Sequence, residues 1–337
     1  MTLDSTINLL NDLIAIDSVN PSLAPGGAGE QEIANFVAAK MRSIGMDVEV
    51  TDVTSGRPNV VGVLESRNSG PALMFCGHLD TVGVERMTAP FKPVEREGRL
   101  YGRGSGDMKG GVAAMIEAAR LISQTGGPQT GRLIVAAVVD EEYASIGAES
   151  LVKSWHADAA VVTEPTDLIV GVGHKGFSWA EITVEGRAAH GSRPAEGRDA
   201  ISRMGRVLSA LEKLDRSLQS RPPHSVLGTA SLHASLIEGG RELSTYPDRC
   251  VLQFERRTIV GEKPDVIREE AEEILSNLRA EDSEFKASAK LLFERSPYET
   301  PSDSPLPAKI CRIPVPHSMP RMRREFPRRQ SLPRMQI

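Results

Sequence analysis

The amino-acid sequence predicts an α/β protein with two domains. Over about the first 170 residues, stretches with the apolar pattern of strands alternate with stretches of helical periodicity, which is typical of a layered α/β domain. Residues 177–293 then follow the order βαββαβ, the ferredoxin-like pattern. A length of 337 residues accommodates two domains. We expect the first domain at 1–175 and the second at 176–294, with 295–309 returning to the first.

The elements of the first domain follow from apolar patterns taken in chain order. Apolar residues three and four positions apart predict helices, and alternating or continuous apolar runs predict strands. One run is apolar throughout, as in a strand covered on both faces. The helices are expected near 7–14, 33–44, 112–119 and 145–153, and the strands at 46–50, 60–64, 73–77, 133–139 and 159–163.

The strands and helices of the second domain are predicted from the same kinds of apolar pattern. Its strands alternate apolar and polar residues, and its helices carry apolar stripes. Two short segments, 175–176 and 294–298, are expected to be the hinges that join it to the first domain. The strands are expected at 177–185, 232–236, 251–257 and 285–293, and the helices at 201–211 and 266–278.

Composition excludes several classes of protein. The chain is 40% apolar and 25% charged, as in ordinary globular proteins. Its three cysteines are too few and too scattered for a disulfide framework. A net charge of −5 argues against nucleic acid as the main partner. No run reaches the length of a membrane span, and residues 1–16 do not resemble a signal peptide, so a cytoplasmic protein is expected.

Several predicted strands end in acidic residues or histidine. Ligands of open α/β sheets gather outside the carboxyl ends of the strands, so these side chains are expected at one edge. A single His-x-Asp pair, or one pair of adjacent acids, is more typical of a solvated loop than of a metal site. Several such endings on one edge favour a metal site instead, because gathered carboxylates repel one another unless cations neutralise them. The candidates are His78, Asp80, Asp107, Glu141, Glu142 and Glu164.

Six motifs resemble those of a known family. In order and spacing they are similar to the metal-dependent peptidase and deacylase family that includes acetylornithine deacetylase, succinyl-diaminopimelate desuccinylase, aminoacylase and glutamate carboxypeptidase. The resemblance extends from residue 1 to about residue 305. It implies a layered α/β/α, zinc-peptidase-like catalytic domain with an inserted ferredoxin-like lid. The motifs are HLDTV at 78–82, GRGSGDMKGG at 102–111, DEEYASIGA at 140–148, TEPT at 163–166, AAHGSRP at 188–194 and ERRTIVGE at 255–262.

The resemblance implies a site for two divalent metal ions, zinc first, with cobalt and manganese as alternatives. Asp107 would bridge the two metals. His78 and Glu164 would complete the coordination of one metal ion, and Glu142 would be a ligand of the other. These assignments agree with the ligand types that such metals prefer.

Two further carboxylates have other roles in this resemblance. Asp80 would orient His78 by accepting the imidazole N–H that the metal does not use. Glu141 would act as general base and then as general acid during amide hydrolysis. The family also has a cis peptide after its bridging aspartate, so one is expected at Asp107-Met108.

The inserted domain is implied to form a homodimer. His190 resembles the family histidine that reaches the neighbouring subunit's site and stabilises the oxyanion, and Arg257 resembles the arginine that holds the substrate carboxylate. The alternatives are a turn histidine and a solvated strand arginine. Arg256 is adjacent to Arg257 and is an alternative carboxylate binder.

The C-terminal segment departs from the family pattern. Residues 310–337 contain seven arginines, five prolines and one acidic residue, and lack a helical or strand period. The segment is expected to be frameshifted or disordered. A family member would supply a last histidine ligand here, beside Glu142. Without it, the chain is expected to be a weak hydrolase with a single metal held by His78, Asp107 and Glu164.

The function expected from the resemblance is hydrolysis of the amide bond of a small N-acyl amino acid. The alternatives are a dipeptidase or carboxypeptidase of the same family, and a catalytically inactive member. The expected partners are the small substrate and a second copy of the chain, with neither nucleic acid nor membrane.

Overall fold

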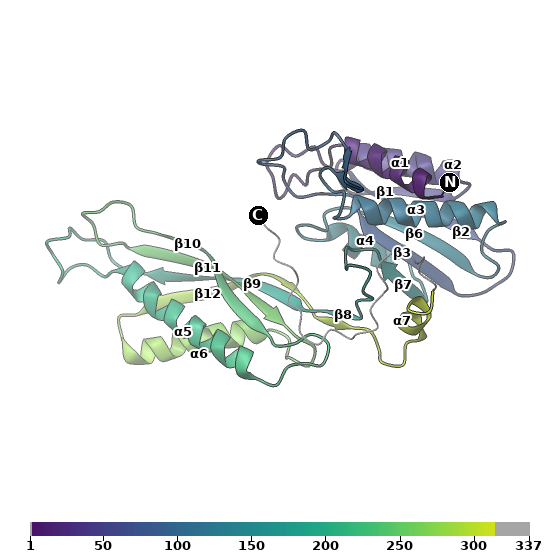
Figure 1. Ribbon diagram of the computed structural model, residues 1–337. Coiled ribbons are helices and arrows are strands. Elements are labelled where there is room, and N and C mark those ends of the chain that lie inside the picture. Colours follow the sequence, from purple (N-terminus) through teal and green to yellow (C-terminus); the bar gives the residue numbers. More distant parts are fainter. Residues whose placement is uncertain (1, 314–337) are drawn as a thin grey trace. The chain divides into compact units, whose positions relative to one another are not determined.

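The computed structural model describes residues 2–313 and divides the chain into two compact units, Met1–Leu168 and Ile169–Ile337 (Figure 1). The prediction of a frameshifted or disordered tail lies, from residue 314 on, outside the described residues. The expected boundary at 175/176, and the return of 295–309 to the first domain, stay predictions. Within residues 2–313, none of the helices is both long enough and apolar enough to cross a membrane.

The first unit is built on a five-stranded sheet. Its strand order is β1-β2-β6-β3-β7, with β3 and β7 parallel to their neighbours and β1 and β2 antiparallel to theirs. His78 at the end of β3 pairs in register with Val138 at the end of β6, so the carboxyl ends of three parallel strands form one edge. The strands are β1 (Asp47–Thr54), β2 (Arg57–Glu65), β3 (Ala72–His78), β6 (Arg132–Val138) and β7 (Ala159–Val162). A separate hairpin joins β4 (Val94–Arg96) and β5 (Arg99–Tyr101).

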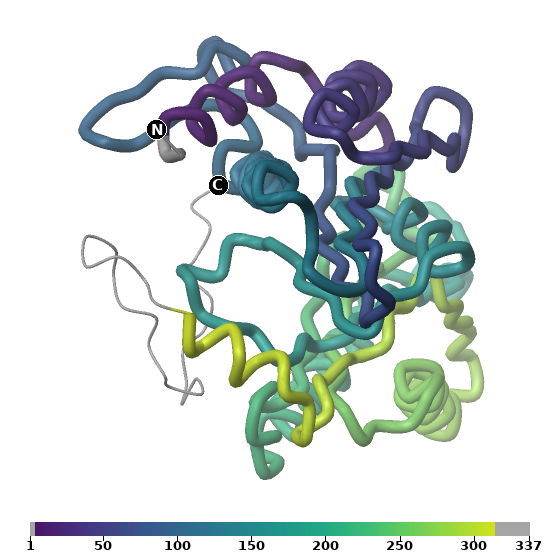
Figure 2. Tube along the Cα trace, turned by 90° about the vertical axis from the view of Figure 1, so that its right-hand side faces the viewer, coloured from purple at the N-terminus to yellow at the C-terminus, as the bar shows by residue number. Residues whose placement is uncertain are grey.

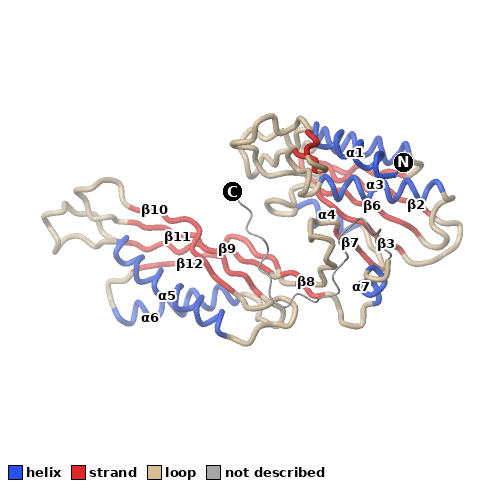
Figure 3. Tube along the Cα trace, in the orientation of Figure 1, coloured by secondary structure: helices blue, strands red, loops and turns tan. Residues whose placement is uncertain are grey.

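Helices cover both faces of this sheet. On β6, Leu133, Val135 and Ala137 pack with α1 (Thr2–Ala15), α2 (Gln31–Ser43) and α3 (Lys109–Gln124). The alternate residues, Ile134 and Ala136, pack on the other face with Leu151 of α4 (Ile146–Ser154). This confirms the prediction of a strand covered on both faces. Figure 3 shows α1 and α3 on one side of the strands, and Figure 2 looks almost along α3.

The second unit is the predicted βαββαβ element. Its sheet has the order β10-β11-β9-β12 with every neighbouring pair antiparallel, which is the ferredoxin-like arrangement. Two helices pack on one face over a core that includes Ile182, Leu211 and Leu275. The elements are β9 (Gly176–Glu185), α5 (Ala200–Ser220), β10 (Ser231–Gly239), β11 (Arg249–Thr258), α6 (Val266–Glu281) and β12 (Lys286–Arg295). The short β8 (Gly173–His174) pairs with β13 (Tyr298–Glu299), and α7 spans Pro305–Ile310.

Two glycines bring the start of α3 close to the strand ends. A Cβ atom on Gly111 would lie 2.3 Å from the carbonyl oxygen of Thr163, which follows β7. A Cβ atom on Gly77 would lie 2.7 Å from the Cε of Met108. Both distances are shorter than packed atoms allow, so the absence of side chains at these positions places Asp107 beside His78 and Glu164.

Candidate metal centre

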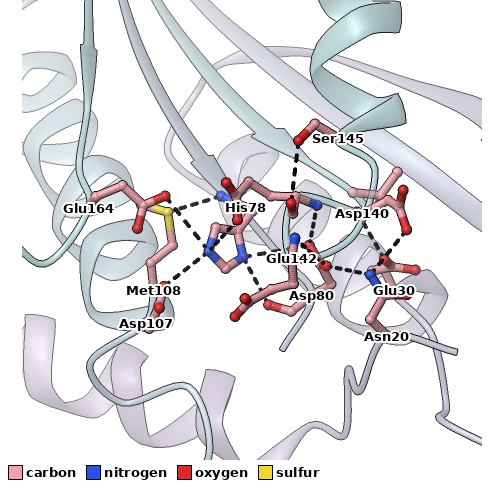
Figure 4. A network of polar contacts seen from close by, with 12 residues as sticks. Asn20, Glu30, His78, Asp80, Asp107, Met108, Asp140, Glu142, Ser145 and Glu164 are labelled. Carbon is pink, nitrogen blue, oxygen red and sulfur yellow. Dashed lines mark hydrogen bonds and ion pairs between the residues drawn. The ribbon is translucent and has the colours of Figure 1, made fainter. Parts of the chain in front are cut away.

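His78 lies at the centre of the carboxyl edge and is 1% exposed. Its Nδ1 lies 2.9 Å from the backbone carbonyl oxygen of Asp80, and its backbone N–H donates to the sulfur of Met108 (Figure 4). The Asp80 carboxylate is farther away, with Oδ1 3.5 Å from Nδ1. The nearest acceptor is therefore the backbone carbonyl oxygen of Asp80, whereas the sequence analysis predicted its carboxylate. Because Nδ1 faces an acceptor, Nε2 is the nitrogen that faces the site.

Carboxylates surround Nε2 of His78. The Oδ1 of Asp107 lies 3.1 Å away, the Oε2 of Glu141 3.7 Å and the Oε1 of Glu164 3.8 Å. The imidazole is buried, whereas these three acids are partly exposed. Each comes from a different segment: the loop before α3, the turn after β6 and the end of β7. The strand-end argument from the sequence thus identified side chains that lie together.

The charge in this cluster shifts the protonation of its members. The pKa of Glu142 and that of Glu164 are each raised to about 7, first by burial and then by the charges of neighbouring carboxylates. Burial also raises the pKa of Glu141. For His78, burial opposes the charged form, but hydrogen bonds to Asp107 and Asp80 raise the pKa to about 11. A positive charge is therefore favoured where Nε2 meets the acids, and this is the place that a divalent cation would occupy.

The donor atoms fit divalent metal ions. The described part of the chain contains two groups of potential ligand atoms, and within each group the atoms lie within 4.8 Å of one another. The first group is His78 with Glu141 and Glu164, and the second is His78 with Asp107 and Glu142. Imidazole nitrogen with carboxylate oxygen suits zinc, cobalt or manganese. All four predicted ligands belong to these groups. Glu141, predicted as the base, joins them as a further potential ligand, and the individual roles stay predictions.

The loop that carries Asp107 is anchored to a distant segment of the chain. The peptide bond Asp107-Met108 is cis, which confirms the expectation. The next residue, Lys109, is buried and its Nζ donates to the carbonyl oxygen of Ile16 at 2.7 Å. Burial lowers the pKa of Lys109 to about 8. Sequence reasoning missed this lysine, because its acceptor lies 93 positions earlier in the chain.

Cys76 precedes His78 by two residues on β3 and is a neutral thiol. Burial, followed by the charges of Glu164 and Glu141, raises its pKa to about 12. A protonated thiol favours a role for Cys76 as a small packing residue rather than as a thiolate ligand.

The other predicted site residues lie in the second unit. His190 is exposed, and its Nδ1 is 2.8 Å from the Oγ of Ser192. Arg257 is 43% exposed, with its guanidinium 5.2 Å from the centre of the Phe177 ring. Their roles toward the metal site stay predictions.

Arg256 differs from its neighbour. Its side chain is 0% exposed, and its guanidinium pairs with both Glu262 and Glu270. Because β11 alternates its side chains between faces, Arg256 points to the helix-covered core and Arg257 to the opposite face. The alternative that Arg256 binds a substrate carboxylate is not supported, because this guanidinium is already buried and paired.

The chain is similar to a known protein family and to several curated proteins. The model of peptidase family M20/M25/M40 matches residues 74–313. An N-formyl-4-amino-5-aminomethyl-2-methylpyrimidine deformylase of Bacillus subtilis is 31% identical over 77% of this chain and 65% of its own length. An acetylornithine deacetylase of Proteus mirabilis is 31% identical over 92% of this chain and 82% of its own. The chain thus spans just under two thirds of the first relative and more of the second.

Solved structures show the same fold. A tripeptidase of Staphylococcus aureus has a TM-score of 0.73 and 22% identity, covering 91% of this chain and 80% of that one. Human carnosine dipeptidase 1 has a TM-score of 0.70 and 18% identity, covering 96% and 84%. A Bacillus subtilis structure described as a dinuclear metal-binding peptidase has a TM-score of 0.63 and 17% identity, covering 88% and 76%.

The names of the sequence relatives support an enzyme that acts on amide bonds. With most of its length matched by the family model, this chain belongs to peptidase family M20/M25/M40.

Proposed function

We propose that this protein is a metal-dependent hydrolase that cleaves the amide bond of a small N-acyl amino acid. The observation that carries the proposal is the cluster of carboxylates around Nε2 of His78 at the carboxyl edge of three parallel strands. The deacetylase and deformylase relatives support an acyl group on nitrogen as the target. The overall reaction consumes one water and yields a carboxylic acid and an amine.

The ligands of the metal are proposed from the donor set. As the resemblance implies, one cation would be held by Asp107, His78 and Glu164, and the other by Asp107 and Glu142; all four residues are potential ligands in the structure. When bound, divalent cations lower the pKa of water and polarise the amide carbonyl. Among residues 2–313, both candidate groups use His78 as their imidazole. We therefore propose one tightly held cation, zinc first with cobalt or manganese as alternatives, and a second held more weakly.

Glu141 is proposed as the general base and acid. Its carboxylate is about half exposed and near His78, and its pKa is raised by burial. A carboxylate in this position can take a proton from the attacking water on Oε2 and deliver it to the leaving nitrogen. The raised pKa makes the carboxylate a stronger base toward the attacking water, and the carboxylic acid so formed can then give its proton to the more basic leaving nitrogen.

Substrate recognition and assembly are proposed for the second unit. Arg257 is exposed and presents a guanidinium, the group that binds a carboxylate through two parallel hydrogen bonds. His190 would stabilise the oxyanion in the site of a neighbouring subunit. A homodimer through this unit is supported by the edge strand β10, where Leu236 and Ile237 are 66% and 55% exposed. A cytoplasmic location is part of the same proposal.

The test combines metal content with activity on purified protein. Wild type, His78→Ala and Glu141→Gln are analysed for zinc per chain and assayed on N-acetylornithine, N-succinyl-diaminopimelate and simple dipeptides. Two control variants change the same residue types on exposed surface away from the cluster, His156→Ala and Glu65→Gln. We expect activity in wild type and both controls, loss of metal in His78→Ala, and loss of activity with retained metal in Glu141→Gln.

The proposal fails if wild type retains metal and hydrolyses none of these amides. It also fails if Glu141→Gln retains full activity. Preference for dipeptides over N-acyl amino acids would support the peptidase alternative instead.

A further inference from the structure

Behind the metal site lies a buried polar cluster that sequence reasoning did not identify. Asn20, Glu30, Arg57, Asp80 and Asp140 are all buried, and they include three carboxylates and a single guanidinium. They come from segments up to 120 positions apart in the chain. Figure 4 shows Asn20, Glu30 and Asp140 beside Asp80, on the side of the site away from Asp107 and Glu164. Such a cluster must satisfy its charges internally, because water does not reach it.

Asn20 joins two of the carboxylates. Its Nδ2 donates to the Oδ2 of Asp80 at 2.7 Å and to the Oδ1 of Asp140 at 3.1 Å. Its Oδ1 accepts from the backbone N–H of Ser22 at 2.9 Å, which fixes the orientation of the amide. Asn20 is therefore a neutral donor of two hydrogen bonds between two like charges.

Asp80 in turn holds the two glutamates of the site. Its Oδ1 accepts from the backbone N–H of Glu141 at 3.0 Å, and its Oδ2 accepts from that of Glu142 at 3.1 Å. Its backbone carbonyl contacts Nδ1 of His78. Although burial opposes ionisation, hydrogen bonds from His78, Asn20 and Glu141 keep the pKa of Asp80 below its usual value. A shift of this carboxylate would move His78, Glu141 and Glu142 together.

Asp140 closes the turn that carries these glutamates. Its backbone is left-handed, with φ of 62°, and its carbonyl oxygen accepts from the N–H of Ser145 at 2.6 Å. Its Oδ2 accepts from the N–H of Ala144 at 3.2 Å, and its Oδ1 pairs with Arg57 at 2.9 Å. Arg57 also pairs with Glu30, so one guanidinium serves two acids.

We propose that Asn20 is a positioning residue, which sets the place of Glu141 and Glu142 by holding Asp80 and Asp140 together. The effect on activity rests on the proposed function, whereas the effect on the turn 140–145 does not. Without the amide, Asp80 and Asp140 lose a shared donor in a buried place and repel each other. The turn would then loosen, because five of its backbone N–H groups donate to these two residues.

Hydrogen–deuterium exchange measures the turn directly. Metal-free wild type, Asn20→Ala, Asn20→Ser and Asn20→Asp are compared for peptides covering 140–145 and for the adjoining strand β6. We expect faster exchange at 141–145 in Asn20→Ala than in wild type. Exchange should be faster still in Asn20→Asp, because this acid adds a third negative charge beside Asp80 and Asp140. Serine keeps one donor, so its effect should be smaller than that of alanine. Exchange within β6 should be unchanged.

Activity and metal affinity provide the second measurement. Residues that hold metal ligands in place typically contribute about 10–100-fold to metal affinity or to activity. We expect Asn20→Ala to lose activity by a factor of this size. The loss should appear in kcat, because the substrate-binding residues are unchanged. The matched control is Asn68→Ala, at an exposed asparagine whose Nδ2 donates to the carbonyl oxygen of Gln129 and not to the cluster. Ile33→Ala, a core truncation on α2, controls for general destabilisation.

Unchanged exchange at 141–145 in all three Asn20 variants would overturn the inference. Equal acceleration at these residues in Ile33→Ala would do the same, because the effect would then be global. If wild type lacks amide hydrolase activity, the proposed function fails, while faster exchange in Asn20→Ala still supports the positioning role.

Discussion

Replacing Arg256 by alanine should destabilise the second unit strongly, whereas the same change at Arg257 should not. The Arg256 guanidinium is buried and donates to Glu270 at 2.9 and 3.0 Å, to Glu262 at 2.6 and 3.3 Å, and to the backbone oxygen of Arg257 at 2.6 Å. The two glutamates are themselves only 14% and 13% exposed. Removing the cation leaves two nearly buried carboxylates side by side. Breaking a buried pair in this way typically costs about 3–5 kcal/mol.

Arg257 provides the matched control, because it is the same residue type one position along the same strand. Its partners are a single carboxylate, Glu255, and the face of Phe177. Exposed ion pairs and exposed cation–π contacts each contribute up to about 1 kcal/mol. We therefore expect Arg257→Ala to lower the free energy of unfolding by about 1 kcal/mol.

Urea unfolding monitored by tryptophan fluorescence measures this difference. The chain has two tryptophans, and Trp155→Phe leaves Trp179 on β9 as a reporter of the second unit. In this background, Arg256→Ala should lower the midpoint of unfolding well below that of Arg257→Ala. A loss below about 1 kcal/mol in Arg256→Ala would refute the reasoning, because it would mean that the carboxylates find other partners or become protonated at little cost.

Three further predictions concern the site and the assembly. Removing divalent metal with a chelator should abolish activity, and added zinc should restore it, as measured by amine release; activity that survives complete metal removal would contradict the metal-dependent mechanism. Gly111→Ala should lower the free energy of unfolding by about 1–3 kcal/mol and weaken metal binding, because the new Cβ would lie 2.3 Å from the carbonyl oxygen of Thr163. Urea unfolding and zinc titration measure the two effects. A zinc affinity equal to that of wild type would show that α3 shifts without disturbing Asp107. Ile237→Glu on the exposed edge strand should convert the proposed dimer to a monomer, as measured by light scattering. A dimer that persists in this variant would contradict an interface at β10.

The sequence predicted much of the fold and the gathering of the site. The apolar run that became β6 and the βαββαβ order of the second unit were both identified from periodicity. Strand ends predicted that His78, Glu141 and Glu164 would meet, because the ends of parallel strands share one edge of a sheet. These features depend on local patterns and on general rules of topology, and both can be read from one sequence.

Other features depend on contacts that a local pattern does not contain. Asn20 and Arg57 are each followed by proline, which indicates only a turn or the start of a strand, and their partners lie far along the chain. The hairpin β4-β5 was missed because each of its strands has only three residues, too few to show a period. The choice of the Asp80 carbonyl over its carboxylate as the nearest acceptor for His78 is a matter of atomic geometry.

The placement of every candidate metal ligand within Met1–Leu168 has a thermodynamic consequence. A ligand that binds only the folded state stabilises that state by mass action, by about 2.7 kcal/mol at a hundred times its dissociation constant. Zinc should therefore raise the melting temperature of the first unit and leave that of the second unchanged. Calorimetry with increasing zinc would show one transition moving and the other fixed, so the cation serves as a label for the cooperative unit that it binds. A single transition that moves as a whole would instead mean that the two units melt as one.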